Sequence, residues 1–200
     1  SMSVKPTPSR DFGPFFVLGA PYRAKLSPID VVPLKVEENS EKPKPGEPLR
    51  VRGKINALDK ESLIELKDQY ITIDLWQASP SGEYDYQEKD GVFKPYLSYR
   101  GTLNDHSTSK EFDFRCRTIA DDKGNYEFET VLPPPYFDPE DGTWRCPHIH
   151  FYIQCKGFEP LVTQMMFEGQ EKNDVDNHIL PELTVSPILK EKNGVRWWDA

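Results

Sequence analysis

The sequence predicts an all-β protein, a two-sheet β-sandwich with an extended N-terminal arm and little helix. Short runs rich in β-branched and aromatic residues recur from residue 49 onward between turn signals, as in antiparallel sandwiches. Polar and apolar residues alternate in two of these runs, 50–55 (RVRGKI) and 126–131 (YEFETV), so one face of each would be buried. Prolines are spread through residues 1–48 and keep them out of helices and sheet interiors.

The expected elements follow in chain order. Residues 1–48 are expected to form a proline-rich arm and linker that ends in EKPKPGEP, and residues 49–200 a β-sandwich domain, a division that suits a chain of 200 residues. Strands are expected at 49–57, 70–77, 111–120, 125–132, 147–154 and 161–167. The sequence DDKG at 121–124 supplies a turn between two of them. Short helices are expected only at 59–67 and 174–183.

Composition and charge argue against two classes of function. The net charge of -8 is opposite to the basic face of a nucleic-acid-binding protein, so no nucleic-acid partner is expected. No window approaches the roughly 18 consecutive apolar residues that a membrane span requires, so no membrane partner is expected. Three cysteines without framework spacing favour a reducing compartment, and we expect a cytoplasmic protein. A signal peptide removed ahead of Ser1 is left open.

Two of the four histidines form the sequence His148-Ile149-His150 at the start of an expected strand. Alternate side chains of a strand share a face, so both imidazoles would project to the same side. Imidazole binds zinc, copper, iron and nickel alike. The pair indicates a metal site without identifying the metal, and a pair of hydrogen-bonded or exposed histidines is the alternative.

Two tyrosines stand where a strand gives way to a loop. Tyr84 follows Pro-Ser-Gly at 80–82, and Tyr136 follows three prolines at 133–135. A single tyrosine in such a place is usually a packed aromatic whose hydroxyl reaches solvent. No cysteine or carboxylate stands at a convincing ligand spacing, and the acidic residues at 138–141 are expected to form a solvated turn.

In combination, these segments resemble the intradiol ring-cleavage dioxygenases, the catechol, protocatechuate and hydroxyquinol dioxygenases. Residues 76–84 (WQASPSGEY) resemble the family's Trp-Gln-Ala-x-x-x-Gly-x-Tyr, and 117–136 resemble its strand, turn and strand before Pro-x-Pro-Tyr. Residues 144–151 (WRCPHIHF) and 163–164 (TQ) resemble Trp-Arg-Pro-x-His-Ile-His-Phe and the Thr-Gln pair after it. Residues 13–21 (GPFFVLGAP) resemble a segment of the catechol branch. The common order and spacing make the resemblance specific.

The resemblance implies a non-haem iron site with Fe(3+) as the cofactor. Its ligands would be Tyr84, Tyr136, His148 and His150, and Tyr136 would also act in catalysis by leaving the iron when substrate arrives. Phenolate is a hard anion that suits ferric iron, and the metal charge ionises a phenol whose usual pKa is near 10. The implied partners are a small catechol-type substrate and O2. The implied reaction inserts both oxygen atoms and opens the ring between the hydroxylated carbons to a muconate-type diacid.

The resemblance gives roles to three more residues. Arg145 matches an arginine that contacts substrate and stabilises negative charge on the ring, and its alternative is a structural ion pair with a nearby acid. Gln164 matches a glutamine that hydrogen-bonds oxygen species at the metal, and its alternative is a polar strand end. Pro14 matches a wall of the substrate pocket, and its alternative is an ordinary packed arm.

The chain departs from the family pattern in one place, because the proline after the arginine has moved to Pro147 and Cys146 stands in its position. We expect Cys146 to be a buried bystander rather than a fifth ligand. His106 and His178 match no family ligand and are expected at the surface. The family's oligomeric states do not transfer to this chain, so a homo-oligomer stays open.

Two other functions compete. A transthyretin-like sandwich could keep the fold and bind a ligand without turnover. A zinc or copper hydrolase could use His148 and His150, but it would need a carboxylate or cysteine to complete the metal shell.

Overall fold

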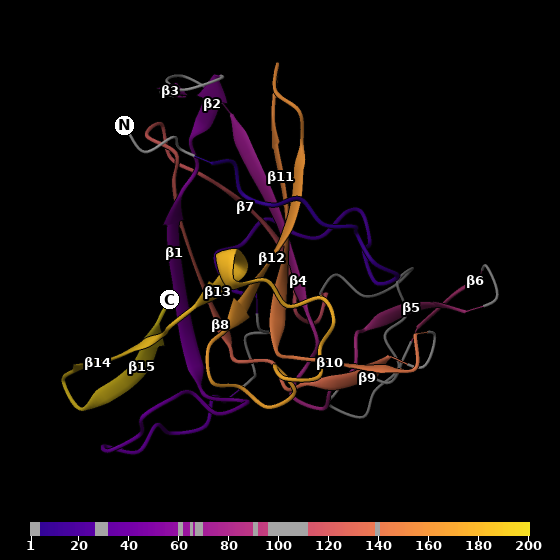
Figure 1. Cartoon of the computed structure of the whole chain (residues 1–200). Coiled ribbons are helices and arrows are strands. Elements are labelled where there is room, and N and C mark those ends of the chain that lie inside the picture. Colours follow the sequence, from indigo (N-terminus) through magenta and orange to yellow (C-terminus); the bar gives the residue numbers. More distant parts are fainter. Residues whose placement is uncertain are drawn as a thin grey trace.

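The computed structural model of the chain describes residues 5–26, 32–59, 62–64, 66, 70–89, 92–95, 112–138 and 141–200. Nearly all regular structure in these ranges is β-strand, and the only helix among them is the single 3-10 turn η1, Pro181–Leu183 (Figure 1). The predicted all-β class is therefore confirmed. None of the described helical residues forms a segment long and apolar enough to cross a membrane.

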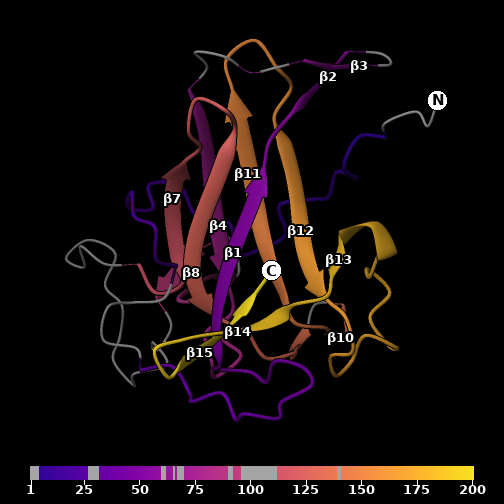
Figure 2. The ribbon, with the colours of Figure 1, turned by 90° about the vertical axis from the view of Figure 1, so that its left-hand side faces the viewer.

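Two sheets make up the sandwich. The five-stranded sheet has the order β13 (Thr184–Val185), β12 (Leu161–Phe167), β11 (His148–Cys155), β4 (Ile71–Gln77) and β7 (Arg115–Ile119). The four-stranded sheet has the order β14 (Ile188–Lys192), β15 (Val195–Asp199), β1 (Pro48–Lys54) and β8 (Asn125–Val131). In Figure 2, β1 and β8 lie in front of β4 and β11, so the two sheets pack face to face.

Three short hairpins extend from the sandwich. They are β2 (Ala57–Asp59) with β3 (Ser62–Ile64), β5 (Tyr86–Lys89) with β6 (Val92–Pro95), and β9 (Tyr136–Asp138) with β10 (Thr143–Arg145). The helix expected at 59–67 is wrong, because Ala57 pairs with Ile64 across the β2–β3 hairpin. A helix of nine residues is marginal without an apolar face to bury, and cross-strand pairing satisfies the backbone instead. At 174–183 only η1 is helical, and turns precede it.

The core lies between the two sheets and explains which way the candidate histidines point. Ile149 and Phe151 of β11 are buried in it, together with Val51 and Phe128 from the opposite sheet. Because side chains alternate along a strand, the even-numbered residues of β11 face away from this core. His148 and His150 therefore lie on the outer face of the five-stranded sheet.

The N-terminal arm covers that outer face. The amide of Arg10 donates to the carbonyl of Val162 at 2.6 Å, and the rings of Phe12 and Phe16 pack on Trp76 with ring centroids 6.5 and 4.9 Å away. In Figure 1 the arm, in blue, crosses beside β11 on the side away from β1. Leu26 then enters the core with no exposed surface. A domain boundary at residue 48 stays a prediction.

Candidate metal centre

A row of four side chains crosses the outer face of the five-stranded sheet. In the strand registers, His150 stands opposite Trp76 on one side and Gln164 on the other, and Trp76 stands opposite Arg115. Directly opposed residues of paired strands project from the same face. Residues that are far apart in the sequence therefore meet around His150.

The two histidines converge on one point. Their Nε2 atoms lie 3.1 Å apart, and the two residues are buried, with His148 2% and His150 3% exposed. The Nδ1 atom of His148 is 2.6 Å from the carbonyl oxygen of Cys146 and donates to it, so its Nε2 carries a lone pair. The ring of His150 stacks on Trp76 with centroids 4.7 Å apart, which fixes its plane.

Both candidate tyrosines reach the same point. The hydroxyl of Tyr84, in the loop between β4 and β5, lies 3.2 Å from Nε2 of His150. Tyr136 begins β9 and shares a hydrogen bond with Tyr84, and the two rings are perpendicular with centroids 5.6 Å apart. The structure thus brings together all four side chains that the sequence proposed as ligands.

In the metal-free protein, burial determines the protonation states of the two histidines and the two tyrosines. Burial lowers the pKa of His148 to about 3, and the positive charge of Arg145 adds to the shift. Burial and then His148 lower the pKa of His150 well below its usual value. Burial raises the pKa of Tyr136 to about 12 and raises that of Tyr84 well above its usual value. Both imidazoles are therefore neutral, and both phenols need a nearby positive charge to ionise.

This donor set fits a hard cation of high charge. Neutral imidazoles present lone pairs with no competing proton, and a strongly positive ion can ionise a phenol that burial keeps protonated. In the part of the chain that the structure describes, no three His, Cys, Asp or Glu side chains lie close enough to hold a metal ion. Within that part, the zinc or copper hydrolase lacks the carboxylate or cysteine that it needs.

Arg145 and Gln164 lie next to the four candidate ligands and contact each other. Nη2 of Arg145 donates to Oε1 of Gln164 at 2.9 Å, and each residue is 8% exposed. Nε of Arg145 also donates to Oδ2 of Asp176 at 3.2 Å. The structural ion pair considered as an alternative for Arg145 therefore exists alongside the contact with Gln164. Asp176 lies 31 residues from Arg145, and no local sequence signal had connected them.

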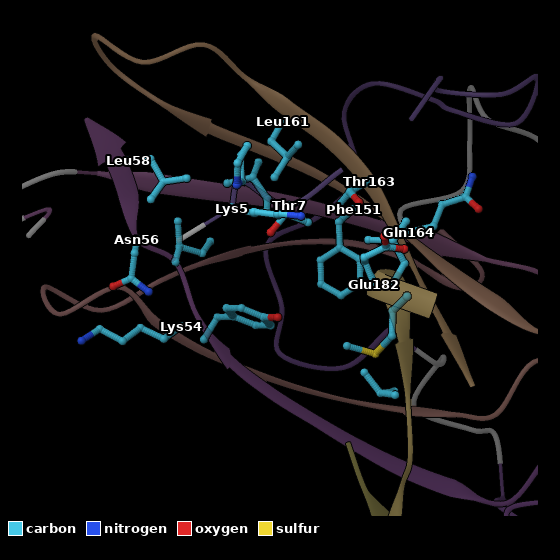
Figure 3. Close-up of a pocket in the computed structure, with 17 residues that line it drawn as sticks. Lys5, Thr7, Lys54, Asn56, Leu58, Phe151, Leu161, Thr163, Gln164 and Glu182 are labelled. Carbon is cyan, nitrogen blue, oxygen red and sulfur yellow. The ribbon is translucent and has the colours of Figure 1, made fainter. Parts of the chain in front are cut away.

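A cavity of about 320 Å³ opens beside the four candidate ligands. Pro14 of the arm lines it, together with Tyr136, His150, Arg145 and Gln164. A second cavity of about 360 Å³ lies on the core side of β11, among Phe151, Leu161 and Lys54 (Figure 3). Gln164 is the only residue named at the candidate centre that lines the second cavity as well.

The remaining candidates can be placed with one exception. Cys146 is buried, as expected, and its thiol is hydrogen-bonded to Asp176. His178 is exposed, as expected, and its Nε2 lies 3.4 Å from Oδ2 of Asp141 at the rim of the cavity beside the candidate ligands. His106 lies outside the described residues.

Comparison with known proteins agrees with the motifs. A family model described as Dioxygenase matches residues 18–192, which is most of the chain. The chain belongs to the intradiol dioxygenase family.

Relatives of this intradiol family member include chlorocatechol 1,2-dioxygenase of Pseudomonas putida, which is 30% identical over 92% of this chain and 62% of that protein. A solved structure of 3-chlorocatechol 1,2-dioxygenase from Rhodococcus opacus 1CP is 25% identical with a TM-score of 0.62, over 96% of this chain and 69% of that one. The dioxygenase domain of a carbohydrate-binding fusion from Streptomyces sp. SirexAA-E shares the fold, at 22% identity and a TM-score of 0.62 over 98% of this chain and 96% of that domain. The chain spans between about half and two thirds of the length of the curated relatives it matches.

Sequence reasoning missed a buried ion pair beside Tyr84 in this family member. Arg115 and Asp85 have side chains only 2% and 1% exposed and are hydrogen-bonded through Nε and Oδ1. The guanidinium carbon of Arg115 lies 5.9 Å from the centre of the Tyr84 ring. Phe15 of the arm also stacks on Tyr84, with ring centroids 4.2 Å apart. Contacts from β7 and from the arm therefore fix the position of Tyr84.

The metal-free protein is expected to lose stability as the pH falls below about 6.5. Folding lowers the pKa of His148 and His150, so the unfolded chain binds more protons in acid, and the free energy of unfolding falls. Each histidine contributes a slope of about 1.4 kcal/mol per pH unit between its unfolded and folded pKa. Urea unfolding of metal-free protein between about pH 7 and pH 5 measures this loss, and His148→Gln should make it shallower. Equal stability at both pH values would contradict the expectation.

Proposed function

We propose that this protein is a non-haem Fe(3+) dioxygenase that inserts both atoms of O2 into a catechol-type diol. The ring would open between the two hydroxylated carbons to give a muconate-type diacid. The observation that carries the proposal is the convergence of two imidazoles and two phenols beside a cavity: Nε2 of His150 lies 3.1 Å from Nε2 of His148 and 3.2 Å from the Tyr84 hydroxyl, which is hydrogen-bonded to Tyr136. The proposed ligands are Tyr84, Tyr136, His148 and His150.

Ferric iron, when bound, would supply the positive charge that ionises the phenols and the diol and would make the aromatic dianion reactive toward O2. The two tyrosines have different surroundings and therefore different proposed roles. Phe15 and Arg115 hold Tyr84, whereas Tyr136 lines the cavity and is more exposed, at 9% against 2%. Tyr136 is thus the tyrosine proposed to move away and to accept a proton from an incoming diol at its Oη.

Arg145 and Gln164 are the residues proposed to act on the substrate. Oε1 of Gln164 accepts from Arg145, so its NH2 group remains to donate toward the cavity and to bind an oxygen species. The guanidinium of Arg145 holds a fixed positive charge at the cavity wall, where it can stabilise negative charge that develops on the ring. Pro14 offers an apolar wall with few rotatable bonds, which excludes water from the ring.

The cavity beside the ligands suits a small substrate. Its volume of about 320 Å³ is near the lower end of the roughly 300–1,000 Å³ of small-molecule sites, which favours a single-ring diol over a larger one. Relatives named for chlorocatechol and 6-chlorohydroxyquinol support the same class. The three cysteines are free, which suits the reducing cytoplasm as the proposed location.

Reconstitution with iron tests the proposal. We expect about one iron per chain and a red colour from charge transfer between tyrosinate and ferric iron. We also expect oxygen uptake with at least one of catechol, 4-chlorocatechol, hydroxyquinol and protocatechuate, and a muconate-type diacid as product. A colourless, iron-free protein after reconstitution would overturn the metal assignment. A red protein that consumes no oxygen would favour a binding module.

A further inference from the structure

A single buried carboxylate ties the catalytic arginine to the segment that carries His148. Asp176 is 4% exposed and lies in the loop between β12 and η1. Its Oδ2 accepts from Nε of Arg145 at 3.2 Å and from the amide of Cys146 at 2.8 Å. Its Oδ1 accepts from the amide of His178 at 2.7 Å. These contacts join the loop to the β10–β11 connection.

The contact with the Cys146 amide depends on the departure from the family pattern. Where that pattern places proline directly after the arginine, no N–H group is available to donate. Here the proline stands one residue later, and the amide of Cys146 donates to Asp176. The carbonyl of the same residue accepts from Nδ1 of His148 at 2.6 Å. Asp176 is therefore linked to Arg145 directly and to His148 through the backbone of one residue, Cys146.

We propose that Asp176 is a positioning residue that holds the guanidinium of Arg145 against Gln164 and fixes the backbone that orients His148. The proposal rests on the proposed function, because Arg145 is taken to act on the substrate.

The physical argument begins with the flexibility of arginine. A free arginine side chain loses rotamer entropy when it is held in one geometry, so its direction must be fixed by partners. Asp176 binds Nε and Gln164 binds Nη2, and two acceptors on different atoms of the planar group define its orientation. Two backbone amides hold the carboxylate of Asp176 in turn.

The charge of Asp176 also matters. An unpaired buried Arg145 would repel a trivalent cation at the neighbouring ligands, whereas a paired arginine keeps its N–H donors with less net charge. Burial alone would raise the pKa of Asp176, but the amides of Cys146 and His178 and then Arg145 lower it overall. The carboxylate therefore stays ionised beside the guanidinium.

The test is a double-mutant cycle between Asp176→Asn and Arg145→Gln on the iron-loaded protein. Alone, Asp176→Asn should lower kcat/KM about 10- to 100-fold and weaken the binding of the diol by more than about threefold, because Arg145 is then no longer held at the cavity wall. Iron content and the charge-transfer spectrum should remain. In the Arg145→Gln background, Asp176→Asn should cost less than about threefold, because the residue through which it acts is gone. Equal costs in both backgrounds would overturn the proposal.

A control variant separates positioning from general damage. Asp174→Asn changes an exposed carboxylate in the same loop and should leave kcat within about twofold of wild type. A loss in Asp174→Asn as large as that in Asp176→Asn would assign the effect to a general change of charge in this loop and contradict the proposal.

A binding measurement separates this proposal from the proposed function. The same cycle is run on the dissociation constant of 4-nitrocatechol, whose own absorption changes when it binds, so no turnover is needed. Wild-type protein that binds this diol and cleaves none would overturn the proposed function. The positioning proposal would still be decided, because coupling between Asp176 and Arg145 supports it and additive effects on the dissociation constant refute it.

Discussion

Replacing Tyr84 by phenylalanine is expected to abolish iron retention and the red colour while the protein stays folded. Phenylalanine keeps the ring that stacks on Phe15 at 4.2 Å, so packing changes little. It removes the hydroxyl oxygen that lies 3.2 Å from Nε2 of His150, and with it one of the two anionic donors proposed for ferric iron. Changes outside the first ligand shell cost 10- to 100-fold in metal affinity. Loss of a ligand should therefore cost more than about 100-fold.

His150→Ala should lose iron in the same way, because it removes a neutral nitrogen ligand at the centre of the site. The matched control is Tyr152→Phe, which removes a phenol hydroxyl from the same strand, where the ring packs against Phe12 and Phe16 instead. Iron content and the visible absorption spectrum are measured for all three variants after reconstitution. Iron content equal to wild type in both Tyr84→Phe and His150→Ala would refute the ligand assignment.

Periodicity predicted the strands and the direction of the histidines well. The runs expected at 70–77, 125–132, 147–154 and 161–167 correspond closely to β4, β8, β11 and β12. Each has the alternating or continuous apolar pattern that burial of one or both faces in a sandwich requires. The shared face of His148 and His150 followed from the same period of two. Tyr84 and Tyr136 were identified as candidate metal ligands only through the family resemblance. No local sequence rule distinguishes a tyrosine that binds a metal from one that packs as an ordinary aromatic.

The missed features depend on contacts that are distant in sequence. The C-terminal hairpin of β14 and β15 was not predicted, since most of its residues are exposed and Trp198 is its only buried side chain. Asp176 and Arg145 are separated by 31 positions, and Asp85 and Arg115 by 30. Opposite charges at such separations are common in any sequence, so only the folded structure reveals which of them meet. The helix expected at 59–67 failed because weak local propensity lost to cross-strand pairing.

Replacing Arg115 by methionine is expected to destabilise the protein by about 3–5 kcal/mol, because it leaves the carboxylate of Asp85 buried without its cationic partner. That cost is a large part of the roughly 5–15 kcal/mol by which a domain is stable. The guanidinium also lies 5.9 Å from the centre of the Tyr84 ring, so the change should weaken iron retention as well. Urea unfolding of the metal-free variant gives the first effect, and iron titration gives the second.

The double variant Arg115→Met with Asp85→Leu separates the buried charge from the packing. Removing both partners of a buried pair is often close to neutral, since neither charge is left unpaired. The double variant should therefore recover most of the lost stability, apart from about 1–3 kcal/mol for the amide of Asp113, which donates to Asp85 at 3.2 Å. If the double variant is as unstable as Arg115→Met, loss of packing rather than an unpaired carboxylate explains the damage. Stability that recovers while iron affinity stays low would show that the pair positions Tyr84.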